Sequence, residues 1–296
     1  MRLTYLKLII TIFFWGSNFA AGKIALQSFD PYSAALVRFS VGALLLMAML
    51  YRANKGFPSI NLREWGLALL AGFMGVFLYN VLFFSGIQHM PTIRASLIIA
   101  FSPIVISLMS SAFFDEKIGL IKWIGIVVSL AGALIVVCRG DFSVVFSSSA
   151  WGLGELLILV SVLAWTIYTL AGKVALRQIP ALTLSAYSTV IGCVLLLGPA
   201  LQHGLTTELS QASWKSIGAA VYMGATATAL GFVWFYEAVR QLGASTTTAV
   251  GNLTPVFAVL IAVVFLGESL SLSTSIGGLL VIGGILLTNL QKVSVT

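Results

Sequence analysis

The chain contains few charged residues. Asp, Glu, Lys and Arg make up 8% of its 296 residues, whereas soluble globular proteins contain about 25%. So little charge excludes a soluble surface of ordinary composition. Hydrophobic residues account for 59% of the chain, and the mean hydropathy is +1.05. The composition therefore indicates a membrane protein.

Cysteine, histidine and catalytic motifs are equally scarce. Cys138 and Cys193 lie in or at the end of apolar stretches, where packing is a better explanation than a disulfide or a metal site. The sequence shows no Ser/His/Asp set, zinc-ligand spacing or phosphate-binding Gly motif. We therefore expect no enzymatic activity, no cofactor and no bound metal ion.

The net charge of +7 does not indicate a nucleic-acid partner, because it comes with no dense basic run. Loop lysines and arginines that orient a membrane protein explain it better. With the N-terminus in the cytoplasm, 11 of the 16 Lys and Arg residues fall on the cytoplasmic side and 5 on the other. This bias predicts a multi-pass protein of the inner (plasma) membrane with both termini cytoplasmic.

Long apolar segments dominate the chain. A helix needs about 20 apolar residues to cross a bilayer. Breaking the sequence at charged, proline and polar clusters gives ten predicted spans: 4–27, 32–51, 64–87, 92–114, 119–138, 152–175, 181–202, 214–240, 245–266 and 271–290. The first resembles a signal peptide, but the spans that follow favour an uncleaved helix. We predict an all-α membrane protein with ten transmembrane helices.

The two halves of the chain repeat each other. AGKIAL at 21–26 returns as AGKVAL at 171–176, 150 residues later, and Trp15 pairs with Trp165 at the same interval. After a drift of two residues, Phe83 pairs with Phe235. Because each half holds five spans, the copies must be inverted relative to each other, as in many transporters. We predict repeats at 1–143 and 150–296 that together form one membrane domain.

Several segments now resemble a known family. The segments FWGSNFAAGKIAL at 14–26, ASLIIAFSPIVISLMSSAFFDEK at 95–117 and ASTTTAVGNLTPVFAVLIAVVFLGESLSL at 244–272 are similar to the EamA type of the drug/metabolite transporter superfamily. One departure is DEK at 115–117, where the family usually has GE. The resemblance implies ten spans in an inverted five-plus-five fold and export of small metabolites. Several members move amino acids, and others move drugs or nucleotide-like compounds.

Two prolines interrupt equivalent spans. Pro103 and Pro255 lie near the middle of the fourth and ninth spans, where each removes a helical hydrogen bond and predicts a kink. Ser102 and Thr254 stand beside them as partners for freed carbonyls. The bends have two interpretations: static kinks that improve packing, or matching hinges beside a central cavity.

Aromatic and amide residues mark a candidate cavity. Trp15 and Asn18 share a helical face, as do Trp165 and Tyr168, and both tryptophans lie nearer mid-span than an interfacial aromatic belt would place them. Rings would hold the apolar part of a solute, while amides and hydroxyls would orient its polar part. The predicted substrate-binding residues are Trp15, Asn18, Tyr79, Asn80, Phe83, Trp165, Tyr168, Trp234, Glu237, Thr248 and Asn252.

Two charges lie inside predicted spans, where a charge is a functional hypothesis by default. Arg38 either extends to the headgroups or binds a carboxylate or a helix end. Glu237 either faces the pathway or pairs locally with Arg240.

Together these features predict a transporter that exports small amphipathic metabolites, such as amino acids, by alternating access. The alternatives are efflux of hydrophobic drugs or toxic compounds and, less favoured, a lipid-handling or non-transporting membrane protein. The expected partners are a small-molecule substrate and membrane lipid. Glycine-rich faces on spans 119–138 and 271–290 leave a homodimer open, with packing inside the bundle the favoured role.

Overall fold

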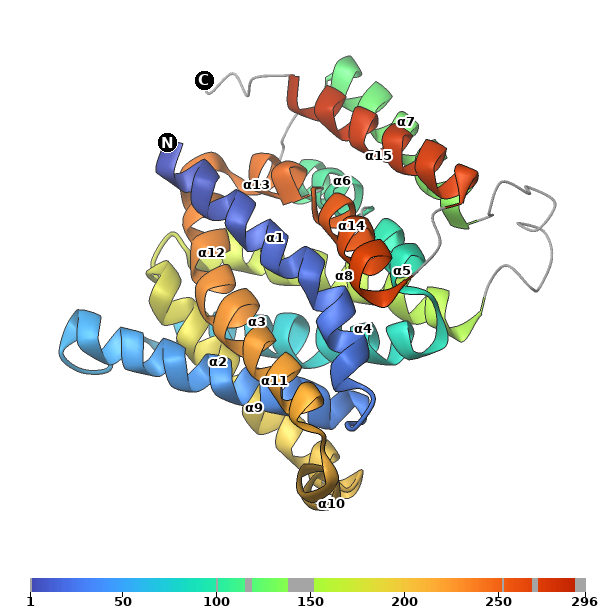
Figure 1. The fold of residues 1–296 in the computed structure, drawn as a ribbon. Helices are drawn as coiled ribbons and strands as arrows, with labels where there is room; N and C mark the ends of the chain where they lie inside the picture. The colour runs from blue at the N-terminus through green and yellow to red at the C-terminus, as the bar shows by residue number, and fades with distance from the viewer. Residues whose placement is uncertain are drawn as a thin grey trace.

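A computed structural model describes residues 2–99, 101–114, 119–137, 152–251, 253–267 and 271–290. This part of the chain is helical and contains no strand (Figure 1). Its helices are α1 (Arg2–Ala25), α2 (Pro31–Asn54), α3 (Leu62–Ala71), η1 (Gly72–Leu78), α4 (Tyr79–His89), α5 (Thr92–Ile99), α6 (Ser102–Phe114), α7 (Leu120–Val137), α8 (Leu153–Ala175), α9 (Ala181–Gln202), α10 (Leu205–Gln211), α11 (Trp214–Met223), η3 (Gly224–Leu230), α12 (Gly231–Leu242), α13 (Ala244–Gly251), α14 (Thr254–Leu266) and α15 (Leu272–Leu290).

Each predicted span corresponds to a helix or a helical series. Among the described residues, six helical segments are unbroken, long and apolar enough to cross a membrane, three in each half of the chain. Two of these, 62–89 and 214–242, contain the π-helical segments η1 and η3 at their centres. The fourth and ninth spans are the pairs α5–α6 and α13–α14, and the fifth and tenth are α7 and α15. The all-α membrane fold is thus confirmed.

Contacts between helices repeat from one half to the other. α1 packs on α14, α11 and α12, while its counterpart α8 packs on α6, α3 and α4. Likewise α2 contacts η3 and α9 contacts η1. Glycines permit the last two approaches: Gly42 lies against Gly224, and Gly192 against Gly72, so that each pair brings two helix backbones together. The bundle therefore has two-fold pseudosymmetry.

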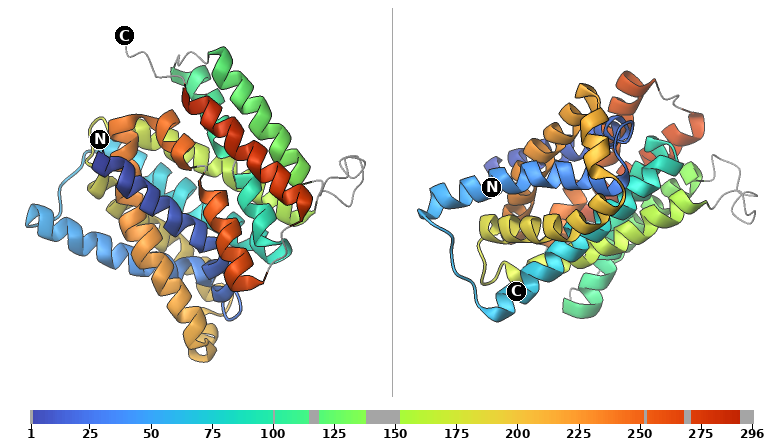
Figure 2. Two further views of the ribbon diagram at one scale, coloured as in Figure 1. Left: turned by 45° about the horizontal axis from the view of Figure 1, so that its top comes forward. Right: turned by 90° about the horizontal axis from the view of Figure 1, so that it is seen from below.

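The two repeats are inverted. α7 and α15, the last helices of each repeat, lie side by side in both Figure 1 and Figure 2. Gly132 of α7 approaches Gly277 and Val281 of α15, whereas Gly284 approaches Gly125, at an earlier turn of α7. Residue numbers therefore increase in opposite directions along α7 and α15, so the two helices run antiparallel. Repeat-equivalent helices that run antiparallel are what an inverted topology requires.

The fourth and ninth spans are broken at the same point. α6 begins at Ser102 and α14 at Thr254, so that the breaks come directly before Pro103 and Pro255. Proline suits the start of a helix because its missing N–H has no partner there. The Ser102 hydroxyl donates to the carbonyl of Ile99 at 2.6 Å, which satisfies one carbonyl at the end of α5. The side chain of Pro255 lies outside the described part of the chain.

Candidate functional site

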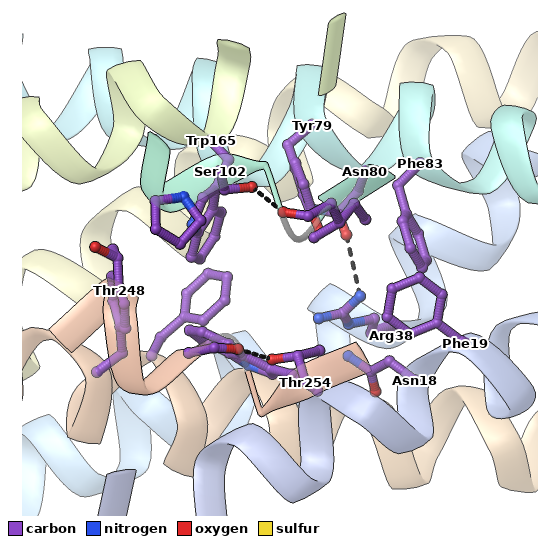
Figure 3. A pocket seen from close by; sticks show the side chains of 16 residues that line it. Asn18, Phe19, Arg38, Tyr79, Asn80, Phe83, Ser102, Trp165, Thr248 and Thr254 are labelled. Carbon is purple, nitrogen blue, oxygen red and sulfur yellow. Dashed lines mark hydrogen bonds between the residues drawn. The ribbon is translucent and has the colours of Figure 1, made fainter. Parts of the chain in front are cut away.

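A cavity of about 80 Å³ lies where the two repeats meet (Figure 3). Its wall combines residues from α1, α2, α4, α5 and α6 of the first repeat with residues from α8, α12, α13 and α14 of the second. The lining residues are Trp15, Asn18, Phe19, Arg38, Tyr79, Asn80, Phe83, Ile99, Ser102, Pro103, Trp165, Phe232, Phe235, Thr248, Gly251 and Thr254.

Aromatic rings form a large part of the wall, with seven of the 16 lining residues aromatic. The repeat-equivalent residues Trp15 and Trp165 meet edge to face, with ring centroids 5.2 Å apart and planes at 88°. Phe235 packs on both indoles, at 5.1 Å from Trp15 and 5.4 Å from Trp165. Phe19 meets Phe83 at 5.2 Å on the first-repeat side. Such rings supply a rigid apolar surface for the carbon skeleton of a small ligand.

Arg38 provides the positive charge of the cavity. The residue is 4% exposed, which argues against the interpretation that its side chain extends to the headgroups. Its Nε donates to the hydroxyl of Thr228 at 3.1 Å, and its Nη1 donates to Oδ1 of Asn80 at 3.0 Å. Arg38 of α2 is thereby fixed between η3 and α4.

The π-helical segments explain how these polar groups are held. A π-helix widens the turn, and such segments are frequent at functional sites. The Asn80 amide donates to the η1 carbonyls of Gly75 and Val76, at 2.9 and 3.0 Å. The Trp15 indole N–H donates to the η3 carbonyl of Ala227 at 3.0 Å. Side chains of the cavity wall are therefore anchored to π-helix carbonyls in both repeats.

The structure brings most of the predicted residues to this cavity. Those that line it are Trp15, Asn18, Tyr79, Asn80, Phe83, Trp165 and Thr248, together with Pro103. Tyr168 lies behind Trp165, buried against Tyr236 at a centroid distance of 5.1 Å and against the backbone of Gly75. Asn252 lies outside the described residues.

Trp234 and Glu237 lie away from the cavity, toward one end of the bundle. Glu237 accepts a hydrogen bond from Lys7 of α1 at 2.9 Å, and the same ammonium stands 5.9 Å from the ring of Trp234. The predicted local pair with Arg240 is therefore replaced by a contact between helices. Both charged side chains are about one-third exposed, at 31% for Lys7 and 33% for Glu237.

The sequence prediction missed several lining residues. Phe19, Ile99, Phe232 and Phe235 are apolar residues among many in the chain, and only Phe235 carried a signal, as the repeat partner of Phe83. Ser102 and Thr254 entered the prediction as partners of the helix breaks rather than as cavity residues. Gly251, at the end of α13, lines the cavity with its backbone.

Two groups of contacts join the repeats beyond the lining of the cavity. At one end, α1 meets α12 through Lys7 and Glu237 and through a 2.6 Å hydrogen bond from Thr4 to Gln241. At the other, Arg94 of α5 binds Glu155 of α8, with Nη2 and Oε1 2.7 Å apart.

Helix directions place these two groups of contacts on opposite sides of the cavity. α1 runs antiparallel to α12, because Trp15 contacts Phe235 while Thr4 contacts Gln241 further along α12. α8 runs parallel to α12, because Trp165 contacts Phe232 and Gly172 contacts Tyr236. The start of α8, with Glu155, therefore lies at the end away from Lys7.

Comparisons with known proteins agree with this architecture. The EamA-like transporter family matches residues 2–138 and 152–290. The chain is similar to the uncharacterized transporter YyaM of Bacillus subtilis (26% identical over 95% of this chain and 92% of that protein). It is also similar to a probable terminal-alkyne amino-acid exporter of Streptantibioticus cattleyicolor (29% identical over 95% and 92%). A crystal structure covering 98% of each chain, with a TM-score of 0.74 and 18% identity, shows the same fold.

Proposed function

Because the chain belongs to the EamA-like transporter family, we propose that this multi-pass membrane transporter exports small amphipathic metabolites such as amino acids. The central cavity carries the proposal. It is the place where both repeats contribute side chains, and it combines an aromatic wall with a buried guanidinium and two amides. An amphipathic solute matches that combination, since rings cover its apolar part and the polar groups orient the rest.

The size of the cavity and the contacts at its two ends support alternating access. A volume of about 80 Å³ is below the roughly 300–1,000 Å³ of typical ligand pockets. A solute can therefore enter only when one end opens and the wall moves apart. The pairs Lys7–Glu237 and Arg94–Glu155 close opposite ends, so that breaking one while the other stays formed would expose the cavity to one side at a time.

The orientation is also a proposal, supported by the excess of Lys and Arg in loops on one side. With both termini in the cytoplasm, the Lys7–Glu237 end faces the cytoplasm and the Arg94–Glu155 end faces outward. A protein in the plasma membrane would then load its substrate from the Lys7 side. We also propose that the chain acts without enzymatic chemistry.

Two observations favour amino acids over hydrophobic drugs. A neutral drug would satisfy the aromatic wall but would leave the buried charge of Arg38 without a counter-ion, which is unfavourable inside a membrane protein. In addition, one relative is named as a probable amino-acid exporter. Hydrophobic efflux remains the competing function because rings form so much of the wall.

Proteoliposomes test the proposal directly. Vesicles loaded with labelled L-amino acids or with ethidium would be compared for efflux through the wild-type protein, Trp165→Ala and Trp123→Ala. Trp123 is a matched control because it lies on α7 and is 44% exposed. We expect amino-acid efflux from the wild type and Trp123→Ala and a large loss in Trp165→Ala. Efflux of ethidium without that of any amino acid would instead support drug export.

A further inference from the structure

The buried charge of Arg38 has no acidic partner within the part of the chain that the structure describes. Among the described residues, the ion pairs join Lys7 to Glu237 and Arg94 to Glu155, and Arg38 takes part in neither. The described residues that line the cavity include no Asp or Glu. Arg38 is nevertheless buried, with 4% of its surface exposed. The protein thus holds a cation in its interior beside an open space.

The hydrogen bonds of Arg38 leave capacity for a ligand. A guanidinium has five N–H donors, and the structure uses two of them, on Nε toward Thr228 and on Nη1 toward Asn80. Both partners are neutral. Figure 3 shows the second terminal nitrogen of Arg38 directed toward the middle of the cavity. The free donors and the uncompensated charge therefore face the space that a substrate would occupy.

We propose that Arg38 is the anion-binding group of the cavity and that it binds a carboxylate of the transported solute. This inference rests on the proposed transport function and makes its substrate class specific. The planar fork of a guanidinium matches a carboxylate, and hydrogen bonds between ionised partners are about twice as strong as neutral ones. A bound carboxylate would also neutralise a charge that is unfavourable when buried alone.

The other lining residues indicate which further groups the solute carries besides its carboxylate. Aromatic rings of both repeats would cover an apolar side chain of the ligand. Asn18 is 5% exposed, and its Oδ1 is buried with no hydrogen-bond partner among the described residues. A turn of this side-chain amide would bring its oxygen to the cavity, where it can accept a hydrogen bond from an ammonium group of the ligand. The favoured ligand is a carboxylate with a neighbouring ammonium and an apolar side chain, as in an aliphatic or aromatic amino acid.

A purely structural role is the competing explanation, because Arg38 also joins η3 to α4 through Thr228 and Asn80. The two roles differ in what they predict for ligands. A structural clamp would affect folding stability but would not distinguish an acid from its amide. A carboxylate-binding group would make the protein prefer the acid even without any mutation.

The test compares acids with their amides. L-Alanine, L-leucine and L-phenylalanine would compete with their carboxamides for binding and counterflow in proteoliposomes that contain the wild-type protein. We expect at least one acid to bind on the order of 10- to 100-fold more tightly than its amide, the effect of one charge-assisted hydrogen bond. Equal or weaker binding of the acid in every pair would overturn the role of Arg38 while leaving transport intact.

Variants then assign the preference to Arg38. Arg38→Gln should bind acid and amide equally, and Arg38→Lys should keep part of the preference. Arg52→Gln is the matched control, since Arg52 is an exposed residue in the last turn of the same helix. An Arg38→Gln variant that folds, as judged by gel filtration, and retains the full acid preference would overturn the proposal. If that variant does not fold, the ratio of acid to amide binding by the wild-type protein decides whether the proposal holds.

A measurement without transport separates this proposal from the transport function. Thermal stabilisation of the purified wild-type protein by 3-phenylpropionate, but not by 3-phenylpropionamide, would support the anion site even if no flux were seen. In that case transport, not carboxylate binding, would be the part that fails. Absence of stabilisation or binding by every carboxylate tried would overturn the anion site.

Discussion

Neutralising Glu155 should favour opening of the cavity at the Arg94–Glu155 end. The effect should be larger than that of neutralising Lys7 at the opposite end. Glu155 uses both carboxylate oxygens: Oε1 accepts from Arg94 at 2.7 Å, and Oε2 accepts from the backbone N–H of Gly152 at 3.1 Å. Its side chain is 6% exposed, and that of Arg94 is 15% exposed. Glu155→Gln keeps the size of the side chain but removes the charge that joins α8 to α5.

The burial of the pair sets the size of the effect. Breaking a fully buried pair costs about 3–5 kcal/mol, but Arg94 retains some contact with solvent. We therefore take the loss to be that of one charge-assisted hydrogen bond, about 2 kcal/mol. This loss corresponds to a roughly 30-fold shift in the equilibrium toward the form open at that end. The Lys7–Glu237 pair, about one-third exposed, is closer to a surface salt bridge, which is worth about 0.2–1 kcal/mol. Lys7→Gln should therefore shift the opposite opening by no more than about fivefold.

Cysteine accessibility measures both shifts. Asn18→Cys would place a reporter in the cavity wall of a protein whose own Cys138 and Cys193 are changed to serine. A membrane-impermeant maleimide would be added from each side. Glu155→Gln should accelerate modification about 30-fold from the Arg94 side, whereas Lys7→Gln should give a small acceleration from the other side. Unchanged modification in Glu155→Gln, or faster modification from the Lys7 side, would refute the assignment of the two closures.

Three further changes test the fold and its moving parts. Gly224→Ala would place a methyl group 2.3 Å from a carbonyl oxygen of α2, so we expect a loss of about 1–3 kcal/mol in thermal unfolding. Gly218→Ala, with no atom within 4 Å, should not destabilise and serves as the control. Trp15→Phe removes the indole donor to η3 and should lower stability by about 1 kcal/mol while keeping the ring. Pro103→Ala combined with Pro255→Ala should slow counterflow without weakening binding if the breaks are hinges; an unchanged rate would leave them as static kinks.

The sequence predicted the scaffold well because its signals are local. Hydropathy and charge mark each span within a window of about 20 residues, and the half-chain repeat is visible in the printed letters. The short helix α10 at 205–211 was not predicted, since LTTELSQ is mostly polar and too short to show a clear apolar pattern. The sequence also gave no sign of η1 and η3, because a single widened turn leaves hydropathy unchanged.

The cavity wall was harder to predict because it depends on partners distant in the chain. Trp165 and Tyr168 are three residues apart on one helix, yet only Trp165 lines the cavity. Tyr168 instead occupies the space that Gly75 leaves open, where a Cβ would stand 2.1 Å from its ring. Similarly, the partner of Glu237 is Lys7, more than 200 residues away, whereas sequence spacing suggests only local pairs such as that with Arg240.

The symmetry of the scaffold does not extend to its polar chemistry. In the 150-residue register, Arg38 corresponds to Ser188 and Asn18 corresponds to Tyr168, and neither counterpart lines the cavity. Among the described lining residues, the charge and the amides therefore come from the first repeat, while the second supplies rings, threonines and a glycine. A solute that binds with its carboxylate on Arg38 must keep that orientation whichever end is open, because α2 carries the anchor in both states. The two repeats can exchange conformations, whereas the carboxylate of the ligand stays bound to Arg38. We therefore expect the protein to recognise the carboxylate equally from both sides of the membrane.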